Sequence, residues 1–356
     1  MKHLRALDQK ARGYVPIAVW RRLFPKSSVC VLYHMVSDAP LPHLKHYRYL
    51  GAAEFDDDVT YLKEQFGFIT YDEMLQRRIQ ENSVCDNAAT LTFDDGFAQC
   101  ATVVQPILLR HAATCIFFVI TDLIDNRVMF RESQASLCIE AIYQRPVEVL
   151  EAIIHELELD AKPPASVPRE QKHLLDELDR FAPPALEHLQ LLLRWLVTIT
   201  PAQVNLMDRL CDRLGVDVHA YLAKNRPYLS AQQIMQLHSN GFTIGAHSCS
   251  HPRLQELSLT QAEYEIVESC RIIRDLTGQK SVPFAFPWSG ADLDRAWLEQ
   301  IRRKYDFVGL FFDAYGFRPD VRFVVQRIKG ERPPGQSIGT VLHSYWSSRL
   351  SWHHKG

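Results

Sequence analysis

The sequence lacks the features that mark a membrane-spanning or nucleic-acid-binding protein. None of its apolar runs reaches the roughly 18 residues that a spanning helix needs. The 40 Lys and Arg residues are balanced by 42 Asp and Glu residues, and the net charge of −2 gives no basic excess for a nucleic acid partner. No signal-peptide hydrophobic segment follows the basic residues 1–12, so we expect a cytoplasmic protein.

The sequence also lacks internal repeats and paired cysteine motifs. Its eight cysteines are scattered, with no C-x-x-C pair, and several lie inside apolar runs. This pattern favours free buried thiols in a reducing compartment over a disulfide framework. The composition, 47% hydrophobic and 23% charged, is ordinary for a globular chain of one large or two small domains.

Short β-rich apolar runs alternate with amphipathic helical patterns along most of the chain. Such alternation predicts parallel α/β architecture, in which helices connect the strands of one sheet. The runs expected to form strands are residues 29–34, 88–93, 114–120, 242–247, 282–287, 307–312 and 323–325.

Helical periodicity replaces this alternation between about residues 132 and 228, which predicts an all-helical insertion. We therefore expect one α/β domain over 28–335, interrupted by the insertion. A helical extension would precede it at 1–27, and an amphipathic helix and tail would follow at 336–356. Residues 17–24 mix apolar and basic side chains, which predicts a helix docked at the edge of the fold and leaves peripheral membrane contact open.

Two adjacent carboxylates, Asp94 and Asp95, follow a buried apolar strand and precede Gly96. Neighbouring carboxylates repel each other unless a metal ion or a shared proton holds them. Open α/β sheets and barrels place their chemistry at this end of a strand. Taken alone, such a pair more often belongs to a turn or caps the N-terminus of a helix.

Two histidines, His247 and His251, lie four residues apart just past another predicted strand. This spacing lets both imidazoles reach one ion. Two histidines and one carboxylate form a common ligand set for zinc and for other divalent metals. The pair alone could also be two surface histidines, but the Asp-Asp pair at another strand end favours a metal site.

These motifs resemble those of the polysaccharide deacetylase family, also called the NodB-homology or carbohydrate esterase 4 family. Residues 91–96 (Leu-Thr-Phe-Asp-Asp-Gly) and 245–252 (Gly-Ala-His-Ser-Cys-Ser-His-Pro) are similar to its first two motifs, and residues 284–290 to its third. The resemblance covers roughly residues 28–130 and 228–330. It implies a distorted (β/α) barrel that hydrolyses acetyl groups on a sugar with a divalent metal, zinc being the preferred ion.

The resemblance also assigns roles to residues. It implies that Asp95, His247 and His251 bind the metal, and that Asp94 is the base that deprotonates the water activated by it. The third motif departs from the family, because Ala285 and Phe286 stand where an arginine usually orients the base. Pro287 is retained and Trp288 replaces a tyrosine, although the Trp288 backbone N–H could still bind the oxyanion.

The general acid of the family is a histidine in a Leu-x-His motif at a strand end. His343 is the C-terminal candidate, but Leu342 belongs to the apolar stripe of a predicted helix. His34, after the first predicted strand, is the better match, and the order of motifs then resembles the circularly permuted branch that includes poly-N-acetylglucosamine deacetylases. Alternatively, His34 is a strand-end histidine bonded to a loop carbonyl.

We therefore expect a metal-dependent hydrolase of an acetylated carbohydrate, with either N- or O-linked acetyl groups. Two alternatives remain open at this point: a hydrolase of the same fold acting on a small non-sugar amide, and a non-catalytic sugar-binding protein. The full set of two aspartates and two histidines argues against the second.

Overall fold

The structure is a computed structural model that describes residues 28–157 and 204–353, except 46, 82, 84–86, 315 and 317–319, together with residues 19, 22, 192 and 196. Most of the expected extension at 1–27 and the centre of the helical insertion lie outside the described residues. The chain divides into two compact units. The first comprises residues up to 38, 48–125 and those from 227 onward, and the second comprises 39–47 and 126–226.

A parallel sheet forms the centre of the first unit. Its strands follow the order β8-β7-β6-β5-β4-β3-β1-β9, and β2 adds to β3. The strands are β1 (Val29–Tyr33), β2 (Gly67–Phe68), β3 (Ala88–Phe93), β4 (Cys115–Val119), β5 (Thr243–Ala246), β6 (Val282–Ala285), β7 (Val308–Asp313), β8 (Val324–Gln326) and β9 (Ile328–Lys329). Every pairing between them is parallel, as the alternation of strands and helices predicts.

One residue, Arg327, separates the two strands at the opposite ends of this order. β8 pairs with β7, while β9 pairs with β1, so the segment 324–329 joins the two edges of the sheet. The sheet thereby curls into a nearly closed barrel, which removes most of its exposed edge. The distorted (β/α) barrel expected from the sequence is confirmed.

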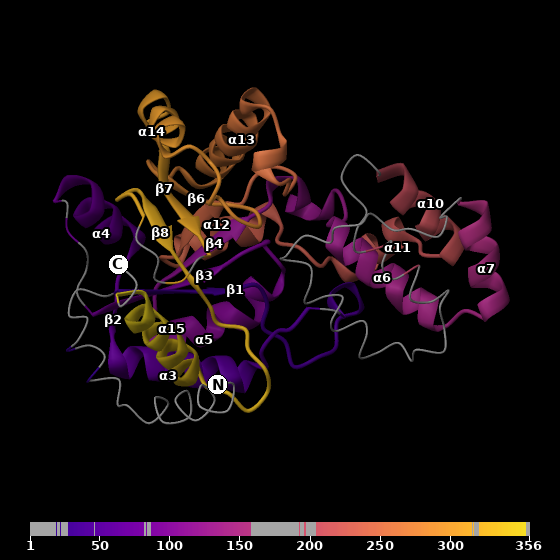
Figure 1. Cartoon of the computed structure of the whole chain (residues 1–356), viewed down its shortest axis with the longest axis horizontal. Coiled ribbons are helices and arrows are strands. Elements are labelled where there is room, and N and C mark those ends of the chain that lie inside the picture. The colour runs from indigo at the N-terminus through magenta and orange to yellow at the C-terminus, as the bar shows by residue number, and fades with distance from the viewer. Residues whose placement is uncertain are drawn as a thin grey trace. The chain divides into compact units, whose positions relative to one another are not determined.

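Helices surround the barrel; Figure 1 shows α13 and α14 on one side of the strands, with α3, α5 and α15 on another. Local sequence sets where several of them begin: Ser230 and Ser258 each accept a hydrogen bond from the third helical residue in a capping box. The helices are α3 (Ala52–Gln65), α4 (Tyr71–Leu75), α5 (Gln105–His111), α12 (Ala231–Ser239), α13 (Leu259–Thr277), α14 (Arg295–Lys304) and α15 (Ile338–His353).

The second unit is helical where it is described. Its elements are the short η1 (Pro42–Leu44), α6 (Arg131–Tyr143), α7 (Val147–Glu156), α10 (Val204–Leu214) and α11 (Val218–Asn225). They enclose a separate apolar core that includes Ile139, Leu150 and Leu210. No helix in the described part of the chain is long and apolar enough to cross a bilayer.

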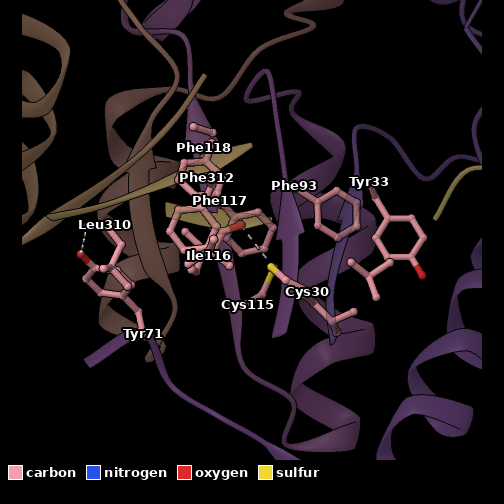
Figure 2. Close-up of a cluster of buried hydrophobic side chains, with 14 of the residues drawn as sticks. Cys30, Tyr33, Tyr71, Phe93, Cys115, Ile116, Phe117, Phe118, Leu310 and Phe312 are labelled. Atoms are coloured by element: carbon pink, nitrogen blue, oxygen red, sulfur yellow. Dashed lines mark hydrogen bonds between the residues drawn. The ribbon is translucent and has the colours of Figure 1, made fainter. Parts of the chain in front are cut away.

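Aromatic side chains fill much of the core around the strands (Figure 2). Tyr33 of β1 stacks on Phe93 of β3 with ring centroids 5.4 Å apart, and Phe93 lies 5.8 Å from Phe117 of β4. Phe118 and Phe312 meet at 5.1 Å. Such close packing of large side chains in defined geometry gives the ends of these strands a rigid base.

Candidate active site

The predicted site residues lie at one edge of the barrel, where the parallel strands end. Tyr33 at the end of β1 pairs with Phe93 at the end of β3, so His34 and Asp94 leave the sheet side by side. The Asp94 N–H donates to the Tyr33 carbonyl at 2.9 Å. His247 follows β5 and donates its N–H to the Val119 carbonyl of β4, also at 2.9 Å. This is the edge at which barrels of this type carry their chemistry.

Asp95, His247 and His251 form a candidate metal centre, since each offers one ligand atom and these atoms lie within 4.8 Å of one another. Asp95 Oδ1 is 3.5 Å from His247 Nε2 and 3.8 Å from His251 Nε2. The His247 Nδ1 lies 2.9 Å from the Ala285 carbonyl, which can only accept a hydrogen bond. Nδ1 therefore carries the proton, and Nε2 faces the cluster with a free lone pair.

The electrostatics of His247 agree with a ligand role. Burial lowers its pKa to about 4, although the Asp94 charge acts in the opposite direction. The imidazole is therefore neutral at physiological pH, which metal ligation requires. The donor set of two imidazoles and one carboxylate fits zinc or a similar divalent ion.

Four non-glycine residues of the site have positive backbone φ angles. They are Asp95 at 71°, Ser248 at 63°, His251 at 62° and Trp288 at 61°. Each costs on the order of 1–3 kcal/mol and persists only where the surrounding structure imposes it. Gly96 follows with φ 75°, and a Cβ there would lie 3.0 Å from the Val119 side chain, so this turn requires glycine. Two of the candidate ligands, Asp95 and His251, thus have strained backbone conformations.

Arg327 holds Asp94 through a bidentate ion pair. Its Nη1 and Nη2 lie 2.6 and 2.8 Å from the two carboxylate oxygens, and Nη1 also donates to Thr92 Oγ1 at 3.3 Å. Burial alone would raise the pKa of Asp94, but the charge and hydrogen bonds of Arg327, together with His247 and His34, outweigh burial and lower that pKa. Asp94 is therefore an ionised, oriented carboxylate separate from the three candidate ligands.

Arg327 was not among the predicted site residues, because the family resemblance places the arginine that orients the base in the third motif. The guanidinium comes instead from the junction of β8 and β9, the barrel seam at which the two edges of the sheet meet. One sequence signal existed: a positive charge interrupts the apolar run from Phe323 to Ile328. The side chain is only 1% exposed, and a buried arginine needs a partner.

His34 is held by Glu331, which follows β9. Glu331 Oε1 lies 3.0 Å from His34 Nδ1 and also accepts the His34 backbone N–H. Burial alone would lower the pKa of His34, but the Glu331 carboxylate reverses the shift and raises that pKa to about 9, with smaller help from Asp95 and Asp94. His34 is 24% exposed, while the rival candidate His343 lies within α15 rather than at a strand end.

A second buried ion pair fixes the segment that carries Glu331. Arg332 donates to both carboxylate oxygens of Asp58 on α3, at 2.5 and 2.6 Å. The Tyr33 hydroxyl donates to the same carboxylate at 2.9 Å. Sequence reasoning missed this pair as well, because 274 residues separate its members.

The third motif forms a tight turn after β6. The Ser289 N–H donates to the Pro287 carbonyl at 2.7 Å, which makes Trp288 the centre of a γ-turn and accounts for its positive φ. The Trp288 indole packs 5.5 Å from the His251 ring, and the Arg253 guanidinium lies 4.4 Å over it. Trp288 therefore flanks one of the candidate metal ligands.

Comparison with known proteins agrees with this geometry. Residues 202–307 match the family described as polysaccharide deacetylase. The matched segment contains His247, His251 and the third motif, whereas Asp94 and Asp95 precede it. The resemblance found in the sequence is confirmed over this segment.

A solved deacetylase structure shares the fold at low sequence identity. A Streptococcus pyogenes deacetylase, PplD, in complex with acetate is 13% identical; the match covers 90% of this chain and 99% of that one, with a TM-score of 0.53. IcaB from Ammonifex degensii is 14% identical over 92% of this chain and 97% of that one, with a TM-score of 0.47. A search among curated proteins found no significant match.

Proposed function

We propose that the protein is a metal-dependent deacetylase that hydrolyses N- or O-linked acetyl groups on a carbohydrate. The proposal rests on the different surroundings of the two adjacent aspartates, Asp94 and Asp95. Arg327 fixes Asp94 as an ionised carboxylate, while Asp95 lies with His247 and His251 in a cluster suited to a metal. Family membership supplies the acetylated carbohydrate as the class of substrate.

Asp95, His247 and His251 would hold the metal, for which zinc is the best candidate. When bound, a divalent metal lowers the pKa of water to about 7 and polarises the acetyl carbonyl. His247 is neutral and its Nδ1 bonds to the Ala285 carbonyl, so its Nε2 is able to bind a metal ion.

Asp94 accepts the proton of the attacking water. Its carboxylate gives one lone pair on each oxygen to Arg327, and each oxygen retains a second acceptor position. The ion pair keeps the carboxylate charged and aimed, so the base needs no reorganisation before proton transfer. General base catalysis of this kind contributes on the order of 10²–10⁴-fold in rate.

His34 donates a proton to the leaving nitrogen or oxygen. Glu331 binds Nδ1, which leaves Nε2 to carry the transferred proton. With a pKa of about 9, the imidazole is protonated at neutral pH and available as an acid. The Trp288 backbone N–H would help to bind the oxyanion, and the Trp288 indole would line the substrate site.

Acetate release tests the proposal. Zinc-loaded protein is incubated with N- and O-acetylated oligosaccharides, and acetate is quantified beside chelator-treated protein and the Asp94→Asn variant. We expect acetate from the zinc-loaded protein, loss after chelation with recovery on adding zinc, and a drop of at least ~10²-fold in Asp94→Asn. Acetate release that survives both chelation and Asp94→Asn would overturn the mechanism, and no release from any acetylated sugar would overturn the function.

A further inference from the structure

Two of the three residues between the candidate ligands His247 and His251 are held by a carboxylate from outside the motif. Glu265 Oε2 accepts the backbone N–H groups of Cys249 and Ser250 at 2.8 and 3.1 Å. Glu265 Oε1 accepts the Ser250 hydroxyl at 2.8 Å. One side chain thus takes three hydrogen bonds from the centre of the loop, and a charged acceptor makes each of them stronger than a neutral one would.

This loop has a conformation that it would not adopt without support. Ser248 and His251, at its two ends, both have positive φ, and the His251 N–H turns back to the Ser248 hydroxyl at 2.8 Å. The bonds to Glu265 act between these two strained residues. They offset the cost of the strain and fix the direction in which His251 leaves the loop.

Glu265 itself stands on a rigid support. It lies in the middle of α13, a helix of 19 residues that begins at a capping box and ends at Gly278. Ile266 and Ile273 of the same helix are fully buried in the barrel core. The position of the carboxylate is therefore set by the packing of the helix rather than by the loop that it binds.

We propose that Glu265 is a positioning residue for the metal centre, which holds the 248–250 loop so that His251 meets His247 and Asp95 at ligand distance. The proposal rests on the proposed function, since it assumes that these three residues bind a metal. Glu265 acts through the loop and touches no reacting atom. Loss of groups that orient metal ligands typically weakens metal affinity by about 10–100-fold.

Three substitutions separate hydrogen bonding from charge. Glu265→Gln keeps the length of the side chain, with its amide oxygen toward the two N–H groups and its amide nitrogen toward the Ser250 hydroxyl. Glu265→Asp keeps the charge but is too short to span the loop, and Glu265→Ala removes both. Zinc affinity is measured by competition with a chromophoric chelator, and the apo-proteins are compared by thermal unfolding.

We expect Glu265→Ala and Glu265→Asp to lose about 10–100-fold in zinc affinity, and Glu265→Gln to bind nearly as tightly as the unaltered protein. Glu268→Ala is the matched control, because Glu268 lies on the same helix and pairs with Arg271. Unaltered affinity in Glu265→Ala, or tighter binding by Asp than by Gln, would overturn the positioning role. If Glu265→Ala does not fold, the comparison of Gln with Asp decides.

The same titration keeps the two proposals apart. If the unaltered protein binds no zinc or other divalent metal, the metal centre of the proposed function fails. If the unaltered protein binds zinc and releases acetate while Glu265→Ala binds equally well, only the role of Glu265 fails.

Discussion

The two terminal nitrogens of Arg327 lie 2.6 and 2.8 Å from the two carboxylate oxygens of Asp94, across 233 residues of sequence. Two parallel N–H···O bonds of this kind fix both the position and the plane of a carboxylate. The arginine that is absent from the third motif is thus replaced by Arg327, which lies between β8 and β9. Asp94 and Arg327 are therefore distant in the sequence and meet only in the folded barrel.

Replacing Arg327 with lysine should lower kcat while leaving KM nearly unchanged. Lysine keeps the positive charge but cannot form the bidentate fork, so Asp94 would lose its fixed plane. A misplaced base costs up to about 10²-fold in rate. Steady-state acetate release measures the effect, and equal zinc content in the variant excludes loss of the metal. A variant with unchanged kcat would show that Asp94 needs no such orientation.

Replacing Glu331 with glutamine should move the basic limb of the pH–rate profile to lower pH. As the proposed acid, His34 must be protonated, so activity should fall as pH rises through its pKa, which Glu331 raises to about 9. Without this carboxylate, burial favours the neutral imidazole and the pKa falls, so activity at pH 8 is lost first. The profile of kcat/KM against pH reports this group in the free enzyme.

The control for the acid is His343→Ala, since His343 lies on α15 and was the rival candidate. We expect its pH profile to match that of the unaltered protein, whereas His34→Ala loses most activity at every pH. The reverse result would move the acid from His34 to His343.

Replacing Arg332 with methionine should destabilise the fold. The substitution leaves Asp58 buried with its charge uncompensated, and breaking such a pair costs about 3–5 kcal/mol of unfolding free energy. Urea denaturation measures the loss. Adding Asp58→Asn should recover part of it, because the orphaned charge is then removed. Arg271→Met, at a solvent-exposed pair, should change stability little.

Replacing Trp288 with alanine should raise KM and leave kcat largely intact. The indole packs against His251 and Arg253 beside the candidate metal site, whereas the proposed oxyanion contact uses the backbone N–H, which alanine retains. Initial rates over a range of oligosaccharide concentrations separate the two constants. A loss of kcat as large as that of Asp94→Asn would assign the indole a role in the chemical step.

The sequence was most informative about candidate site residues that lie close together along the chain. Asp94 and Asp95 follow one strand and His247 and His251 another, and parallel strands that end at one edge bring such pairs together. His34 could be found because a β-rich run ends in it. The parallel sheet follows from the alternation of apolar strands and amphipathic helices, and the family resemblance implied that the sheet forms a barrel.

The partners of these residues could not be found in the same way. Arg327, Glu331 and Glu265 act on side chains or loops set by the packing of other elements, and no local pattern shows which carboxylate a distant cation will meet. In the sequence, Arg327 is only a charged residue that interrupts a predicted strand. Its contact with Asp94 is visible only in the closed barrel. Glu265 looks like one of several acidic residues on an amphipathic helix until the helix packs beside the loop.

The segment that closes the barrel also carries the residues that orient the proposed base and the proposed acid. Residues 324–332 join β7 to β1, and the same nine residues supply Arg327 to the base, Glu331 to the acid and Arg332 to the anchor on α3. A chain that ends at β7 holds the three candidate metal ligands, Glu265, and the proposed base and acid, but it lacks Arg327, which binds Asp94, and Glu331, which binds His34. Closure of the barrel therefore also brings the proposed base and acid to the residues that orient them, so a barrel left open at this segment would lack both contacts.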